Sequence, residues 1–167
     1  MNRNILYACM LLCSELGANA QASDLPVALA VEAAQAAVEA CKANGYNVTV
    51  TILDADLSIR LVLRGDGARN GTVQIAYRKA YTVIKTGMSS GDFGKTITTP
   101  PATSSGGSPD VPGPVNGDAN LITWAGGLAI KAGGTVIGAI SASGAPGGDK
   151  DEACVRAGLA KIAQKLQ

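Results

Sequence analysis

The chain contains no histidine among its 167 residues. Histidine is the commonest zinc ligand, a common axial ligand of haem iron and the side chain that normally titrates near neutral pH. Its absence excludes a Ser-His-Asp triad and a Cys-His pair. Any acid–base chemistry must therefore use Asp, Glu, Lys, Tyr or Cys with a perturbed pKa.

An excess of charge of either sign is also absent, since 14 basic residues face 13 acidic ones. This near-neutral balance argues against nucleic acid or an anionic membrane surface as the main partner. Long apolar runs are lacking too. The run Ile5–Leu12 is far shorter than the roughly 20 residues that span a bilayer, and no second long run follows. We expect a soluble mature chain with no membrane partner.

The N-terminal residues have the features of an export signal. Arg3 precedes the apolar run Ile5–Leu12, and Ala18-Asn19-Ala20 supplies a small-x-small cleavage pattern. We predict a signal peptide over residues 1–20, one domain over 21–167 and a periplasmic or secreted protein. The alternative is a frayed apolar N-terminus on a cytoplasmic protein.

Only two cysteines, Cys41 and Cys154, lie outside the predicted signal. In an oxidising compartment they are candidates for a disulfide between the first and last helices. The alternative is two small buried apolar side chains. Neither cysteine has a zinc-binding spacing, and the calcium-like run Asp54-x-Asp56-x-Ser58 lacks the required glycine and final acid, so we predict no metal site.

Hydrophobic periodicity predicts an α/β (α+β) domain in the order α-β-β-α-β-β-β-α. Its sheet is predicted to be five-stranded and mainly antiparallel, with helices packed on it. The best-defined predicted elements are helices over 24–43 and 72–85, strands over 46–53 and 59–64, a hairpin of strands over 128–130 and 135–141, and a helix from about 149 to 166. Residues 87–120 are predicted to be loop, followed by three strands.

Four charged residues, Asp54, Arg64, Asp66 and Lys79, fall at strand ends or at the facing start of the second helix. If Arg64 and Lys79 point into one cleft, they form a cationic pocket suited to a carboxylate or propionate. The alternative is a set of structural salt bridges. The acidic run Asp149, Asp151 and Glu152 is interpreted as a helix start.

Two further side chains are candidates for a ligand site. Trp124 is the single tryptophan and is either a core residue or a platform for a ligand. Met88 is either a soft ligand for haem iron or a packing residue.

Six runs of sequence, taken together in their order and spacing, resemble the GlcG/HbpS family, which is often labelled haem-binding. They are V-T-I-L-D-A, R-G-D-G-A, I-A-Y-R-K-A-Y-T-V, G-G-L-A-I, V-I-G-A-I-S-A-S-G and D-K-D-E-A-C-V-R-A-G-L. The resemblance implies a profilin- or PAS-like domain, assembly into homo-oligomers, and binding of haem or a corrinoid.

The chain departs from the family pattern at Arg69-Asn70-Gly71, where members often carry histidine, and at Leu57-Ser58 and Ala129. Haem ligation here would have to use Lys, Met, Tyr, Cys or Thr. Candidate ligands for a haem titration are Lys79, Met88 and Cys154.

Three hypotheses follow from the sequence. The first is an exported, homo-oligomeric protein that binds haem or another anionic small ligand, with Arg64, Asp66, Lys79 and Trp124 as ligand-binding candidates. The second is a lyase or isomerase in which Lys79 acts with Asp54 or Asp66. The third is a structural oligomer with no small ligand.

Overall fold

The structure is a computed structural model that describes residues 24–98 and 112–166. The predicted signal peptide and part of the long predicted loop lie outside these residues. Within them the chain forms α1 (Val27–Ala43), β1 (Thr49–Asp54), β2 (Ile59–Arg64), α2 (Thr72–Thr86), α3 (Ser90–Thr96), β3 (Gly127–Ala132), β4 (Thr135–Ser143) and α4 (Gly148–Ile162), followed by a 3₁₀ turn at Ala163–Lys165.

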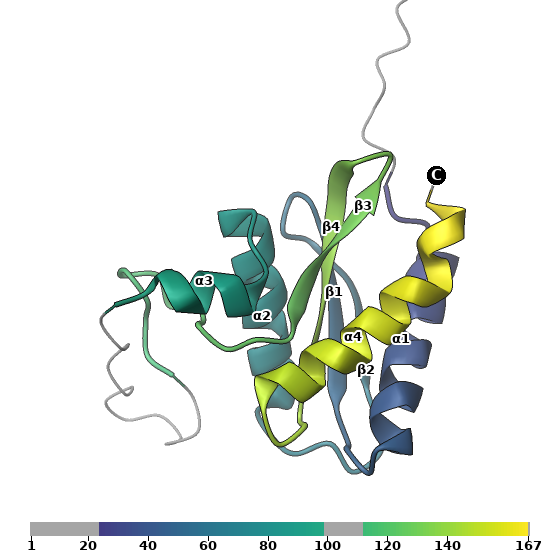
Figure 1. The fold of residues 1–167 in the computed structure, drawn as a ribbon, viewed down its shortest axis with the longest axis horizontal. Coiled ribbons are helices and arrows are strands. Elements are labelled where there is room, and N and C mark those ends of the chain that lie inside the picture. Colours follow the sequence, from purple (N-terminus) through teal and green to yellow (C-terminus); the bar gives the residue numbers. More distant parts are fainter. Residues whose placement is uncertain (1–23, 99–111, 167) are drawn as a thin grey trace, which may run out of the picture.

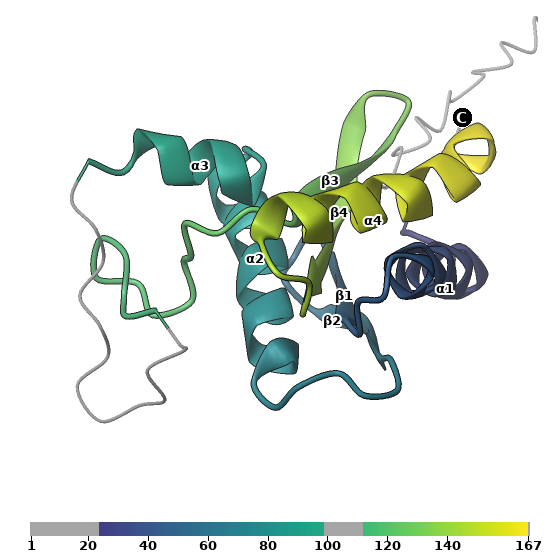
Figure 2. The same ribbon diagram turned by 60° about the horizontal axis from the view of Figure 1, so that its bottom comes forward.

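The four strands form one antiparallel sheet in the order β2-β1-β4-β3. Helices α1 and α4 cover one face of the sheet, and α2 covers the other (Figures 1 and 2). Successive side chains of β1 point to opposite faces of the sheet. Val50 and Ile52 therefore enter the core under α1 and α4, while Leu53 packs under α2. None of the helices in the described ranges is long and apolar enough to cross a membrane.

Small side chains allow α1 and α4 to pack closely. Four alanines of α1, Ala30, Ala33, Ala34 and Ala37, are fully buried. On α4, a Cβ added at Gly158 would lie 2.5 Å from the Ala33 carbonyl oxygen, so only glycine fits at this crossing.

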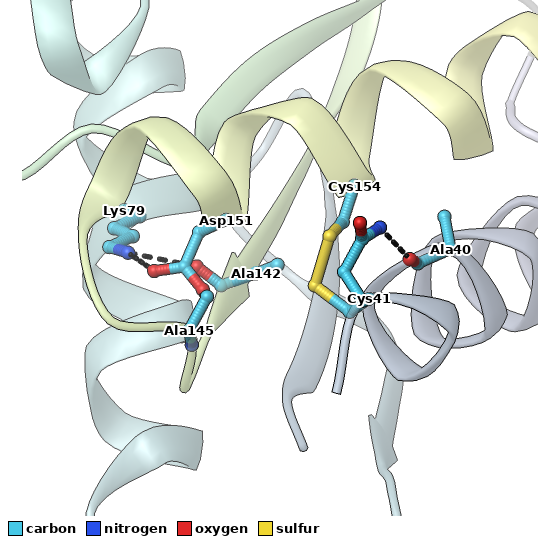
Figure 3. The surroundings of a disulfide bond; sticks show 8 residues. Ala40, Cys41, Lys79, Ala142, Ala145, Asp151 and Cys154 are labelled. Atoms are coloured by element: carbon cyan, nitrogen blue, oxygen red, sulfur yellow. Dashed lines mark hydrogen bonds and ion pairs between the residues drawn. A yellow bond between two sulfur atoms is a disulfide. The ribbon is translucent and has the colours of Figure 1, made fainter. Parts of the chain in front are cut away.

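A disulfide between Cys41 of α1 and Cys154 of α4 joins the same two helices, with their Cα atoms 5.3 Å apart (Figure 3). The sequence left this pairing open. The two cysteines are 113 residues apart, and closing a loop of this length stabilises the folded state by about 4 to 5 kcal/mol. The disulfide therefore supplements a core built largely from small side chains.

The described residues contain four strands rather than the predicted five, because only β3 and β4 follow Asn120. The chain at residues 121–122 pairs with side chains of α2 instead of with a strand. Thr82 Oγ1 accepts from the Ile122 amide at 2.9 Å, and Arg78 Nη2 donates to the Leu121 carbonyl at 2.6 Å. The Ile122 amide and the Leu121 carbonyl, which in a strand would bond to a neighbouring strand, instead bond to side chains of α2.

The predicted loop over 87–120 also contains a short helix, α3. Two glycines among its seven residues lower its helix propensity, which is why the sequence indicated loop. Ser89 Oγ caps it by accepting from the Asp92 amide at 3.0 Å, and Phe93 is buried beneath it. Capping and tertiary packing therefore outweigh the local preference.

Candidate functional site

Lys79 lies inside the protein, with only 1% of its surface exposed. Its ammonium donates to Asp151 Oδ2 at 2.7 Å and to the Ala142 carbonyl at 2.9 Å (Figure 3). The other carboxylate oxygen of Asp151 accepts from the Ala145 amide at 2.9 Å. This group, the Lys79–Asp151 pair, therefore connects α2 on one face of the sheet with the end of β4 and the start of α4 on the other.

Burial is the largest influence on the pKa of both Lys79 and Asp151. Desolvation lowers the pKa of the Lys79 ammonium and raises the pKa of the Asp151 carboxyl, while the attraction between the two charges opposes each shift. Gly126 leaves room for the pair, since a Cβ there would lie 2.8 Å from Lys79 Nζ. Glycine at position 126, directly before β3, is thus a packing requirement of the buried ion pair.

The predicted partners of Lys79 lie elsewhere. Asp54 Oδ1 accepts from Arg60 Nε at 2.9 Å, and Arg60 also pairs with Asp24 at 3.3 Å. Asp66 lines a surface hollow in which Lys79 has no part. The structure therefore does not bring Lys79 together with Asp54 or Asp66, and the lysine's carboxylate partner is Asp151, which the sequence indicated only as part of a helix start.

Arg64 and Lys79 do not share a cleft either. Arg64 Nη2 donates to the Ala68 carbonyl at 2.7 Å and to Asn70 Oδ1 at 3.3 Å. It lines a hollow of about 220 Å³ together with Lys42 and Asp66. Two of the predicted ligand-binding residues, Arg64 and Asp66, thus line the same hollow. The lysine beside Arg64 in that hollow is Lys42, whereas the sequence predicted Lys79.

Trp124 and Met88 are both at the surface, with 44% and 37% of their areas exposed. Trp124 is therefore not a core residue. Neither side chain lines the hollow that contains Arg64.

Tyr46 is the residue around which the hollows of this end of the molecule are arranged. It lines the hollow beside Arg64, a second of about 340 Å³ between the end of α1 and the start of α4, and a third of about 560 Å³ beside the Gly65–Gly71 turn. The sequence predicted Tyr46 as the first residue of a strand, but β1 begins at Thr49. Outside the strand, Tyr46 can border all three spaces.

Four cations surround Tyr46. Lys42 and Arg64 line the first hollow, Lys150 the second and Arg69 the third, whereas Asp66 is the one acidic residue in these walls. The Lys150 ammonium lies 5.5 Å from the centre of the Tyr46 ring, within the range of a cation–π contact. We call these five residues, Lys42, Tyr46, Arg64, Arg69 and Lys150, the Tyr46 surface. Its excess of positive charge can attract an anion.

Sequence reasoning missed Tyr46, Lys42, Arg69 and Lys150 as site residues. They come from the end of α1, the loop between α1 and β1, the turn before α2 and the first turn of α4, and no motif links these segments. The described residues contain no group of three or more His, Cys, Asp or Glu side chains that could hold a metal ion.

Comparison with known proteins identifies the family of this chain. A family model described as "Haem degrading protein HbpS-like" matches residues 25–160, as the sequence resemblance predicted. No curated protein sequence matches the chain.

Solved structures agree with the family model. The crystal structure of HbpS is 32% identical, with a TM-score of 0.70 over 86% of this chain and 94% of that one. A double mutant of Streptomyces reticuli HbpS is 30% identical, with a TM-score of 0.68 over 92% and 97% of the two chains. The PduOC:heme complex shares the fold at 21% identity, with a TM-score of 0.68 over 84% and 96%. The chain belongs to the HbpS-like family.

Proposed function

We propose that this protein binds an anionic small molecule at the Tyr46 surface and that haem is the first candidate. The observation that carries the proposal is the gathering of four cations around the hollows that meet at Tyr46. Support for haem comes from the description of the family as haem-degrading and from the haem bound to PduOC, a protein of the same fold.

The residues present fit the acidic edge of haem. Its two propionates are carboxylates, which the fork of Arg64 and the ammonium of Lys42 can bind by charge-assisted hydrogen bonds. Asp66 in the same wall repels an anion from its end of the hollow and so restricts where the carboxylates lie. When bound, haem would supply a redox-active iron; the protein's part is to hold and orient it.

Export and self-association complete the proposal. The disulfide between Cys41 and Cys154 supports an oxidising compartment, because such bonds persist outside the cytosol.

The edge strand β2 exposes Ile59 and Val62, with 60% and 38% of their areas open, and Val73 of α2 is 41% exposed. Apolar side chains along an unpaired edge favour association with a second copy.

The alternative of a lyase or isomerase receives no support from this geometry. A base or Schiff-base former must reach its substrate, and Lys79 is buried with its ammonium held by Asp151 and Ala142.

The test is a titration of the disulfide-bonded protein with ferric haem, followed by the Soret band. We expect saturable binding that weakens about tenfold in the double variant Lys42→Gln/Arg64→Gln, through loss of the charged contacts. The matched control is Lys131→Gln/Lys161→Gln, which removes two exposed cations that line none of the three hollows and should leave the affinity unchanged. A flat titration with haem and with small dicarboxylates overturns the proposal.

A further inference from the structure

We infer that the disulfide between Cys41 and Cys154 is a site of thiol–disulfide exchange, and that it reacts with a small thiol that carries negative charge. The site is the hollow of about 340 Å³ between the end of α1 and the start of α4, where Cys154 forms part of the wall. The inference needs no bound haem and does not depend on the proposed function.

The disulfide crosses between the two helices whose residues enclose this hollow (Figure 3). Ala40 and Asn44 line the hollow from α1. Ala153 and Ala157, which lie near Cys154 on α4, line it from the other side. Three of these four side chains are single methyl groups, so the walls beside the disulfide are short.

The two cysteines differ in access. Cys41 is completely buried, whereas Cys154 keeps 4% of its surface exposed and is the one of the pair that lines the hollow. A thiolate that enters the hollow therefore meets Cys154 first. In an exchange reaction the accessible sulfur is attacked and the other sulfur leaves as a thiolate. The geometry thus assigns attack to Cys154 and departure to Cys41.

Lys150 gives this hollow its charge. It lies four residues before Cys154, about one turn of α4 away, and lines the same hollow. Its ammonium is 5.5 Å from the centre of the Tyr46 ring, a contact that orients the lysine side chain. Among the described residues, none of those lining this hollow is acidic. A thiolate is the reactive form of a thiol, and a second negative group on the same molecule strengthens its attraction to Lys150.

The exchange takes place in two steps. In the first, the incoming thiolate forms a bond to Cys154 Sγ, the bond between the two cysteine sulfurs breaks, and Cys41 Sγ leaves with the electron pair and takes a proton from solvent. In the second, another thiolate attacks the reagent's sulfur in the mixed disulfide and releases Cys154 as a thiolate. The reagent leaves as its own disulfide. The small thiol is therefore oxidised and the protein disulfide is reduced, with no other co-reactant.

Exchange at this site changes the Tyr46 surface. The Cys41 carbonyl accepts from the Tyr46 amide at 3.0 Å, so the segment that carries Tyr46 is joined to the end of α1 that the disulfide ties to α4. A thiol adduct on Cys154 would also occupy space beside Lys150. An anion in this hollow and a thiol adduct on Cys154 therefore exclude each other.

The experiment treats the disulfide-bonded protein with two thiols of similar size and opposite charge, mercaptoethanesulfonate and cysteamine. The rate at which each thiol opens the protein disulfide is divided by its rate with bis(hydroxyethyl) disulfide, a neutral reference, so that the intrinsic reactivity of the thiol cancels. We expect the normalised rate of the anionic thiol to be about fivefold higher at low ionic strength. High salt should bring the two rates together, because it screens the charge of Lys150.

Two variants and a chemical trap locate the reaction. Lys150→Gln should abolish the preference for the anionic thiol. Lys161→Gln is the matched control, because it removes an exposed cation of the same helix that lines none of the three hollows, and it should keep the preference. When the reaction is quenched with N-ethylmaleimide, peptide mass mapping should find the thiol adduct on Cys154 and the maleimide on Cys41.

Four results would each overturn the inference. They are equal normalised rates for the two thiols at low salt, an unchanged preference in Lys150→Gln, an adduct on Cys41 instead of Cys154, and a disulfide that neither thiol opens until urea unfolds the protein. None of these results bears on anion binding at the Tyr46 surface, which the haem titration tests separately.

Discussion

Lys150 and Asp151 are adjacent residues of α4, yet their side chains belong to two different regions of the molecule. Asp151 turns inward, is 3% exposed and pairs with Lys79. Lys150 turns outward and lies over the ring of Tyr46 beside a hollow. The charges of the inner region are committed to one another and connect elements of the fold. The cations of the outer region outnumber the one acidic residue in the walls of their hollows, and of the four only Arg64 also donates to protein oxygens, those of Ala68 and Asn70, among the described residues. In this chain the position of a cation, rather than its type, separates a structural role from a binding role.

The disulfide lies between these two regions, since Cys154 follows Asp151 on α4 and lines a hollow of the Tyr46 surface. We expect Cys41→Ser/Cys154→Ser to lower the free energy of unfolding by about 4 to 5 kcal/mol, because the unfolded chain regains the entropy of an open loop. Urea unfolding of the oxidised protein and of the variant measures this loss. Wild type treated with a reductant is the control and should match the variant. Equal stability with and without the bond would contradict the role given to the disulfide.

Breaking the inner region alone should have nearly as large an effect. In Asp151→Ala the Lys79 ammonium stays buried without its partner, and we expect a loss of about 3 to 5 kcal/mol in urea unfolding. The double variant Lys79→Met/Asp151→Leu removes both charges and should recover much of that loss. A single variant as stable as wild type would show that the pair does not connect the two layers.

The adjacent residue in the outer region should behave in the opposite way. We expect Lys150→Gln to change the free energy of unfolding by no more than about 0.5 kcal/mol, as is usual for an exposed position. Its affinity for ferric haem should fall about threefold, because one of four attractive charges is lost. A stability loss as large as that of Asp151→Ala, with unchanged affinity, would reverse the comparison between the two regions.

Much of the fold follows from local patterns in the sequence. The alternation before Asp54 predicted β1, the Gly133-Gly134 turn predicted the β3–β4 hairpin, and the acidic start predicted α4. The missing fifth strand and the unpredicted α3 have a shared cause. Both segments are fixed by contacts with residues distant in the sequence, such as Thr82 with Ile122. Local propensity depends only on neighbouring residues and so does not predict such contacts.

The candidate site was predicted less well than the fold. Arg64 and Asp66 were predicted to belong to one site because both fall at a strand end, and in the structure they line the same hollow. Lys79 was predicted to join that site because it falls at the start of the second helix, which was expected to face the strand ends. Its burial depends on Asp151, 72 residues away, and on the space left by Gly126. Tyr46 was missed because its importance arises only where three separate segments meet.

The bond between the first and last helices also bears on how the protein is made. Cys41 leaves the ribosome 113 residues before Cys154, so its covalent partner is absent for most of synthesis. A nascent or truncated chain that ends before α4 lacks both this bond and the helix against which α1 packs. During that interval the alanine-rich face of α1 is uncovered and Cys41 is open to the wrong partner. The disulfide can therefore close only after synthesis has passed Cys154.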